Sequence, residues 1–308
     1  MKQKNFFLYL LMLGLLTGFA ACKKDTTANT GDNAAISTHS DDQSFFSSEV
    51  DAISNDADAI LEYYSAISLR EMDTDPVTVC GAGISWDLQS DPQTATITFN
   101  GGDCVGRKRE GTIVISLAKG TKWKDAGASV SISFQNVKIT RLSDNKSVTI
   151  NGTQTYTNVS GGLLKNLSSQ QTITHTIAAD DLSVTFDNAA KRTWKMAQKR
   201  VFTYDGGVVI ATSGNRTEGD TEGIAEWGTN RFGTAFTTVI SQPLMIRQDC
   251  DFRLTGGVVT HTVGGLSATV TFGLDKDGNP VSCPEGAYYY KLVYTGTNGN
   301  PFTFISVY

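Results

Sequence analysis

The chain has 308 residues, a formal net charge of −5 and only three histidines. Nucleic acids are bound by a basic face, so an acidic chain with scattered basic residues predicts no nucleic-acid partner. The densest basic run, residues 106–109, precedes Glu110 beside a turn-like Gly-Gly and is interpreted as a solvated hairpin rim.

The first 21 residues predict export. Lys2 and Lys4 give a basic start, and residues 6–19 form an almost unbroken apolar run. That run is shorter than the roughly 20 residues of a spanning helix and matches the core of a signal peptide. Small residues directly before Cys22 are similar to the bacterial lipobox, where the thiol takes a diacylglycerol and the new amino terminus another acyl chain. We therefore expect signal peptide 1–21 to be removed.

Two or more acyl chains anchor a protein stably, so the expected partner is a membrane, reached through Cys22. The expected location is the outer membrane, with the protein facing the periplasm or the cell surface. Loss of Lys2 and Lys4 takes the net charge from −5 to −7. An ordinary secretory signal, with Cys22 paired or free, is the alternative.

Residues 22–43 are rich in Thr, Asn, Asp, Ser and Ala, with almost no large apolar residue. Such a segment buries too little surface to order itself, so we expect a flexible tether. The next segment, 44–72, predicts one amphipathic helix. Its apolar residues recur every three or four positions, which lines one helix face: Val50, Ile53, Ala57, Ile60, Leu61, Tyr64 and Ile67. An acidic opposite face favours packing on the protein body over a membrane surface.

From residue 73 to 308 the hydrophobic period changes to two. Alternating runs, among them Ile113-Ile115-Leu117, are separated by turn signals such as Gly264-Gly265. The apolar set of 130–139 slips from even to odd positions, which predicts a β-bulge near Gln135-Asn136. No helix of crossover length intervenes, so neighbouring strands should pair antiparallel. We expect an all-β domain, a large antiparallel meander, arranged as a curved sheet, a partly closed barrel or a sandwich.

Lipidation of Cys22 leaves four cysteines, an even set that allows three pairings. An oxidising compartment would let them form disulfides. A turn at residues 90–93 puts Cys80 opposite residue 103, and a turn at 264–265 puts Cys250 opposite residue 279. Cys104 is one position from the first of these, and Cys283 is four positions beyond the second, a difference that the loop 277–280 could absorb. We therefore expect Cys80 to pair with Cys104, and Cys250 with Cys283.

The sequence predicts no catalytic residue, metal site or cofactor. His39 falls in the predicted tether, whereas His175 and His261 alternate with apolar residues and should face a packed side. Neither has a Cys, Asp or Glu at zinc-ligand spacing. The acidic run 275–279 opens like a calcium loop but has Pro280 at position six, where such a loop needs Gly, and is interpreted as a turn.

Aromatic residues are the best indication of a binding surface. Trp86, Trp123, Trp194, Trp227 and the run Tyr288-Tyr289-Tyr290 could stack on sugar rings, or could pack across strands as in any sheet. An aromatic last residue, Tyr308, is typical of outer-membrane barrels. Polar residues on both faces of several strands argue against a lipid-facing band.

A block from Cys80 through 96–104 to 111–115 resembles a recurrent block in uncharacterised Bacteroidota lipoproteins. So do residues 151–158, 191–194 and 228–231, and the stretch around Cys250 and Cys283. The resemblance covers most of the chain after about residue 75, in consistent order. It implies an exported lipoprotein with this architecture and implies no activity or catalytic residues.

We therefore expect a membrane-anchored, non-enzymatic β-domain that serves binding or envelope structure, with a glycan, a lipid or an envelope protein as its partner. One rival is an extracytoplasmic hydrolase acting on glycan or lipid. The other is a lipid-carrying half-barrel. Converging carboxylates in a cleft would favour the hydrolase, and a large empty apolar cavity would favour the carrier. A flat exposed aromatic strip would favour a glycan binder.

Overall fold

The computed structural model describes residues 30–308, apart from 69–76, 105, 171, 285 and 296–300. The predicted signal peptide, Cys22 and residues 23–29 lie outside the described residues. The helices are α1 (Thr30–Ser68), α2 (Leu167–Gln170) and the 3-10 turns η1 (Leu164–Asn166) and η2 (Gln248–Cys250). The strands are β1 (Ala82–Asp87), β2 (Gln93–Cys104), β3 (Arg107–Leu117), β4 (Ala128–Arg141), β5 (Ser147–Asn158), β6 (Thr172–Phe186), β7 (Lys191–Tyr204), β8 (Val208–Gly214), β9 (Arg216–Glu218), β10 (Thr221–Thr229), β11 (Ala235–Arg247), β12 (Arg253–Val263), β13 (Leu266–Leu274), β14 (Tyr289–Thr295) and β15 (Pro301–Val307).

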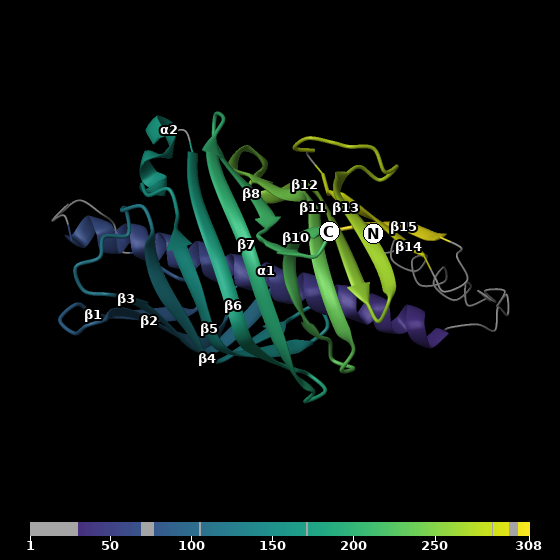
Figure 1. Ribbon diagram of the computed structural model, residues 1–308, viewed down its shortest axis with the longest axis horizontal. Helices are drawn as coiled ribbons and strands as arrows, with labels where there is room; N and C mark the ends of the chain where they lie inside the picture. The colour runs from purple at the N-terminus through teal and green to yellow at the C-terminus, as the bar shows by residue number, and fades with distance from the viewer. Residues whose placement is uncertain (1–29, 69–76, 105, 171, 285, 296–300) are drawn as a thin grey trace, which may run out of the picture.

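All fifteen strands belong to one antiparallel sheet that follows chain order from β1 to β7 and from β10 to β15. Strand β8 pairs with both β7 and β11, and β10 pairs with the same two strands, so these four close a small ring. The expected fold class, an all-β antiparallel meander with one long N-terminal helix, is confirmed. Of the arrangements left open, the chain forms a strongly curved sheet with this one closed ring (Figure 1).

The predicted bulge is present. The β4–β5 register shifts between Phe134 and Val137, and Asn136 adopts a left-handed φ of 52°. The Asn151 side chain accepts a hydrogen bond from the Asn136 backbone N–H at 2.8 Å. On the neighbouring strand a Cβ at Gly111 would collide with the Asn136 carbonyl, and Gly111 has a φ of +100°. The extra residue of the bulge thus requires glycine opposite it.

Helix α1 lies in the trough, our name for the concave face of the curved sheet. It crosses the strands in reverse chain order. His39, near its start, contacts Phe236 of β11 and His261 of β12, whereas Tyr63, near its end, contacts Trp86 of β1. Figure 1 shows α1 along the longest axis of the molecule, with its start at the end that carries β14 and β15. A helix of 39 residues is about 58 Å long.

The helix starts earlier than the sequence predicts, so the expected tether of 22–43 is wrong from Thr30 onward. His39, Asp42 and Gln43 are buried against the sheet. A polar composition counts only the missing apolar surface, whereas Asp42 and Gln43 are stabilised by distant polar partners, Arg231 and Glu226, and His39 packs against aromatic rings. The predicted helical residues 69–72 lie outside the described residues.

The predicted apolar face of α1 is confirmed where the structure describes it: Val50, Ile53, Ala57, Ile60 and Leu61 are at most 2% exposed. They join one core with the inward residues of the strands, such as Ile113 and Ile132. None of the helices among the described residues is long and apolar enough to cross a bilayer.

Both expected cysteine pairs are present, with Cα–Cα distances of 5.9 Å for Cys80–Cys104 and 5.0 Å for Cys250–Cys283. The β12–β13 register pairs Val263 with Leu266, as a turn at Gly264-Gly265 requires. The β1–β2 register pairs Ala82 with Phe99, two positions from the expected one. A shift of the β2–β3 register between Asn100 and Asp103 shows that β2 is irregular just before Cys104.

Candidate functional site

Helix α1 is strongly acidic, with eight Asp or Glu residues and no Lys or Arg. The trough meets it with basic side chains from several strands and turns. The ion pairs along the helix are Asp41 with Arg141 (2.9 Å) and Lys146 (2.8 Å), Asp42 with Arg231 (2.6 Å), Glu49 with Arg107 and with Arg109 (3.0 Å), and Asp56 with Arg109 (3.3 Å). Charge complementarity from Asp41 to Asp56 therefore adds to the apolar packing of the helix.

The first of two buried polar clusters centres on Tyr156 of β5. Its hydroxyl lies 2.7 Å from Asp58 Oδ2 and 2.8 Å from His175 Nδ1. A hydroxyl has one proton, so if it donates to Asp58 it accepts from the imidazole N–H. Burial, together with the negative charge of Asp58, holds the pKa of Tyr156 well above its usual value. The tyrosine therefore stays neutral and joins α1 to β6.

Arg200 of β7 lies beside this cluster and is fully buried. Its Nη2 donates to Asn55 at 2.7 Å, and its Nη1 lies 3.9 Å from Asp58. The Trp123 ring closes the other side, with its centroid 5.3 Å from that of His175. The cluster is thus sealed by aromatic rings and by the helix.

The second cluster surrounds Glu226 of β10, whose carboxylate accepts hydrogen bonds from four side chains. The donors are Gln43, Ser47 (2.8 Å), Trp194 (2.7 Å) and Gln198 (3.2 Å). Burial raises the pKa of Glu226 to about 7, although these donors pull it down.

Two histidines lie next along the trough, with His39 and His261 ring centroids 6.1 Å apart. Burial lowers the pKa of His261 to about 4 and, with the charge of His261 contributing, that of His39 to about 3. The His261 Nδ1 lies 3.1 Å from the Thr238 hydroxyl. His175 and His261 are buried, as their alternation predicts, whereas His39 lies in the core and not in a tether.

Acid–base groups therefore do converge, but beneath α1. Tyr156, His175, Arg200 and Glu226 are each at most 2% exposed. Tyr156, Glu226 and one nitrogen each of His175 and Arg200 bond to one another or to the helix, whereas His175 Nε2 and Arg200 Nε have no hydrogen-bond partner among the described residues. A substrate would reach these groups only after α1 had moved.

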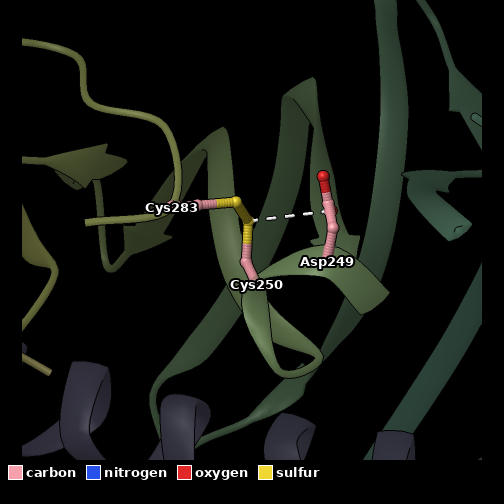
Figure 2. A group of neighbouring side chains, drawn as sticks. All are labelled: Asp249, Cys250 and Cys283. Carbon is pink, nitrogen blue, oxygen red and sulfur yellow. Dashed lines mark hydrogen bonds between the residues drawn. A yellow bond between two sulfur atoms is a disulfide. The ribbon is translucent and has the colours of Figure 1, made fainter. Parts of the chain in front are cut away.

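One further group has metal-ligand residue types: Asp249, Cys250 and Cys283 (Figure 2). The two sulfur atoms are joined in a disulfide, so neither is a thiolate that could bind a metal. The Asp249 carboxylate accepts hydrogen bonds from Arg247 at 2.9 Å. At the acidic run 275–279, the Asp275 carboxylate accepts the backbone N–H groups of Asp277 and Asn279, which closes a turn.

The aromatic residues singled out in the sequence are divided between core and surface. Trp123, Trp194 and Tyr288 are buried, and Trp86, Trp227, Tyr289 and Tyr290 are half-buried. Trp227 stacks under Arg216, whose Cζ lies 4.4 Å from the ring centre. Most of these rings therefore pack in the protein and are not free to stack on sugars.

Among the described residues, five of the nine exposed large apolar side chains lie instead on β15 and just after it: Phe302, Phe304, Ile305, Val307 and Tyr308. Sequence reasoning considered only Tyr308 among them. The absence of any charged residue from 301–308 is the signal that could have identified this surface.

A cavity lies at the far end of the trough, near the end of α1. It measures about 270 Å³ and is lined by residues that include Tyr64, Gln93, Trp123 and Lys124. A smaller neighbour of about 20 Å³ shares Tyr64 and Gln93.

Comparison of the chain with protein-family models, with curated proteins and with solved structures finds no match.

Proposed function

We propose that the chain is a lipid-anchored envelope protein whose β-body is a non-enzymatic binding or structural domain, with α1 as its rigid connection to the membrane. The observation that carries this proposal is the integration of α1 into the body. The segment that follows the lipobox is bound into the trough by ion pairs to β3, to β4 and to the turn after β10.

The proposal places the domain close to the lipid. Eight chain steps separate Cys22 from Thr30, where α1 begins. A fully extended chain covers at most about 3.5 Å per residue, so the start of α1 lies within about 28 Å of a lipidated Cys22. A domain held at so short a distance is suited to act at the membrane surface and not far from it.

Lipidation is tested by Cys22→Ser in the full chain, with incorporation of a labelled fatty acid and partition into detergent as the measurements. The variant should lose both and give an unprocessed or soluble exported form. The matched control is Cys80→Ser with Cys104→Ser, which should retain both. If Cys22→Ser partitions like the wild type, the anchor is wrong.

The lipid-carrying half-barrel is the second candidate, because the sheet is curved and its inner face is apolar. Against it, α1 fills the trough, and the cavity near the end of α1, at about 270 Å³, lies below the 300–1,000 Å³ of typical ligand pockets. Bound lipid in extracts of the purified protein would favour the carrier over the proposed function.

The hydrolase alternative is tested on the buried histidines. We expect no turnover of glycosidase, esterase or peptidase substrates by the purified protein, and modest changes in stability for His175→Gln and His261→Gln. Reproducible turnover that either variant abolishes, with the fold intact, would replace this proposal by an enzyme.

A further inference from the structure

Strand β15 is apolar and exposed on both of its faces. Phe302 and Phe304 point to one side and are 60% and 36% exposed, whereas Ile305 and Val307 point to the other and are 37% and 54% exposed. A strand with apolar residues on both faces is usually buried on both faces. Here β15 ends the sheet in the described part of the chain, beside a half-buried β14 and with Gly278 approaching Ile305 on one face.

The outer edge of β15 is open too. Tyr308 N donates to Tyr288 O at 3.0 Å, and the β14–β15 register continues without a shift. Because hydrogen-bonded and non-bonded pairs alternate, the N–H and C=O groups of Thr303, Ile305 and Val307 point away from β14. Edge strands are usually protected by a charge, a bulge or a covering segment, and residues 301–308 contain no charged residue.

The rings on this surface do not form a flat platform. Phe302 and Phe304 have centroids 6.0 Å apart with planes at 48°, and Tyr290 meets Phe304 at 73°. Tilted rings do not offer the parallel faces that a sugar chain would stack on. They do offer an apolar surface beside the half-buried Tyr290, a composition that suits the boundary between lipid and water. The Tyr308 hydroxyl is bound to the Leu254 carbonyl and the Gly273 N–H, so only the ring of Tyr308 adds to this surface.

The position of this surface indicates what covers it. Helix α1 passes β11 and β12 at His39 and begins nine residues earlier, at the end of the molecule that carries β14 and β15 (Figure 1). Its other end is about 58 Å away. The roughly 28 Å reach from Cys22 therefore ends on the side of the molecule where β15 is exposed.

We infer that β15 and Tyr308 form a second membrane contact, which inserts aromatic and aliphatic side chains into the headgroup region of the membrane that holds the anchor. This inference rests on the proposed lipid anchor. The contact is confined to the interface, because the open N–H and C=O groups of the edge still require water. A lipid surface also accounts for both exposed faces, whereas an added strand would cover the edge and leave the side chains on both faces exposed.

The test uses the full lipidated chain in vesicles of phosphatidylethanolamine with phosphatidylglycerol. An environment-sensitive dye is attached at Thr303→Cys, and the matched control carries it at Gln89→Cys, an exposed residue in the β1–β2 turn on the opposite edge of the sheet. We expect blue-shifted emission at residue 303 and several-fold stronger quenching by nitroxide-labelled lipid than at residue 89. Replacing both Phe302 and Phe304 with Ser should weaken the quenching at residue 303.

Three results would overturn the inference. If the chains do not float with the vesicles, the proposed lipid anchor is wrong, and so is the membrane contact that rests on it. If the chains float but show equal, weak quenching at residues 303 and 89, the membrane contact is wrong and the lipid anchor is unaffected. Emission at residue 303 that depends on protein density and not on nitroxide lipid would assign the edge to a second copy of the chain.

Discussion

Arg109 of β3 contacts Glu49 of α1 through two guanidinium nitrogens, with Nε at 3.1 Å and Nη2 at 3.0 Å from the same carboxylate oxygen. The Glu49 side chain is fully buried, and Arg109 is 6% exposed. The third nitrogen of the same guanidinium lies 3.3 Å from Asp56, seven residues or about two turns further along the helix. A single arginine thus holds two turns of α1 against the sheet.

Removing one partner of a buried ion pair leaves an uncompensated charge. Glu49→Ala should therefore lower the free energy of unfolding by about 3–5 kcal/mol, measured by urea denaturation. The control is Glu218→Ala, which breaks the exposed pair with Arg216 at 2.8 Å and should cost less than about 1 kcal/mol. Equal costs for the two variants would show that α1 is not held by its ion pairs.

Glu226 makes stability depend on pH. In the folded state Glu226 keeps its proton up to about pH 7, whereas the ordinary pKa of a glutamate, which applies to the unfolded state, is 4.5. Between these values the folded state binds more protons than the unfolded state, so the contribution of Glu226 to stability falls as the pH rises. The contribution of Glu226 to the free energy of unfolding changes by about 3 kcal/mol between pH 4.5 and pH 7.

Glu226→Gln cannot titrate, so the free energy of unfolding of the wild type minus that of the variant should decrease steadily from pH 4.5 to pH 7. Urea unfolding at a series of pH values measures this difference. A difference that is constant across the interval would mean that the carboxylate is ionised throughout.

His261 should act with the opposite sign. Its pKa is lowered from 6.5 to about 4, so below pH 6.5 the unfolded state takes up a proton that the folded state refuses. Stability from His261 is present above pH 6.5 and is lost as the pH falls toward 4. His261→Gln should therefore make unfolding less sensitive to acid in that interval. His39, whose pKa is lowered to about 3, acts with the same sign as His261, and Glu226 acts with the opposite sign. The wild type therefore reports only the sum of these contributions, and the variants separate them.

The two disulfides close loops with sequence separations of 24 and 33 residues. In the chain-entropy model each contributes about 3.5 kcal/mol. Cys80→Ser with Cys104→Ser, and Cys250→Ala with Cys283→Ala, should each lower the free energy of unfolding by about that amount. Peptide mapping without reduction should recover the same two pairs. A peptide that joins Cys80 to Cys250 or Cys283 would contradict the hairpin registers.

Local features were readable from the sequence alone. The period-two runs, the bulge at 135–136 and the turn at Gly264-Gly265 depend on residues close in the chain, and so do the cysteine pairs that their registers imply. The apolar stripe of α1 was also correct, because side chains three and four apart share one helix face.

Tertiary structure alone decided how far α1 extends and what the polar residues do. Asp42 is buried because Arg231, 189 residues away, contacts it, and Gln43 is buried because Glu226 accepts its amide N–H. No local pattern reveals a partner at such a distance, and without that partner each polar side chain would prefer water. The closed ring of β7, β10, β11 and β8 could not be predicted from the sequence either, because strand neighbours are set by the curvature of the whole sheet around the helix.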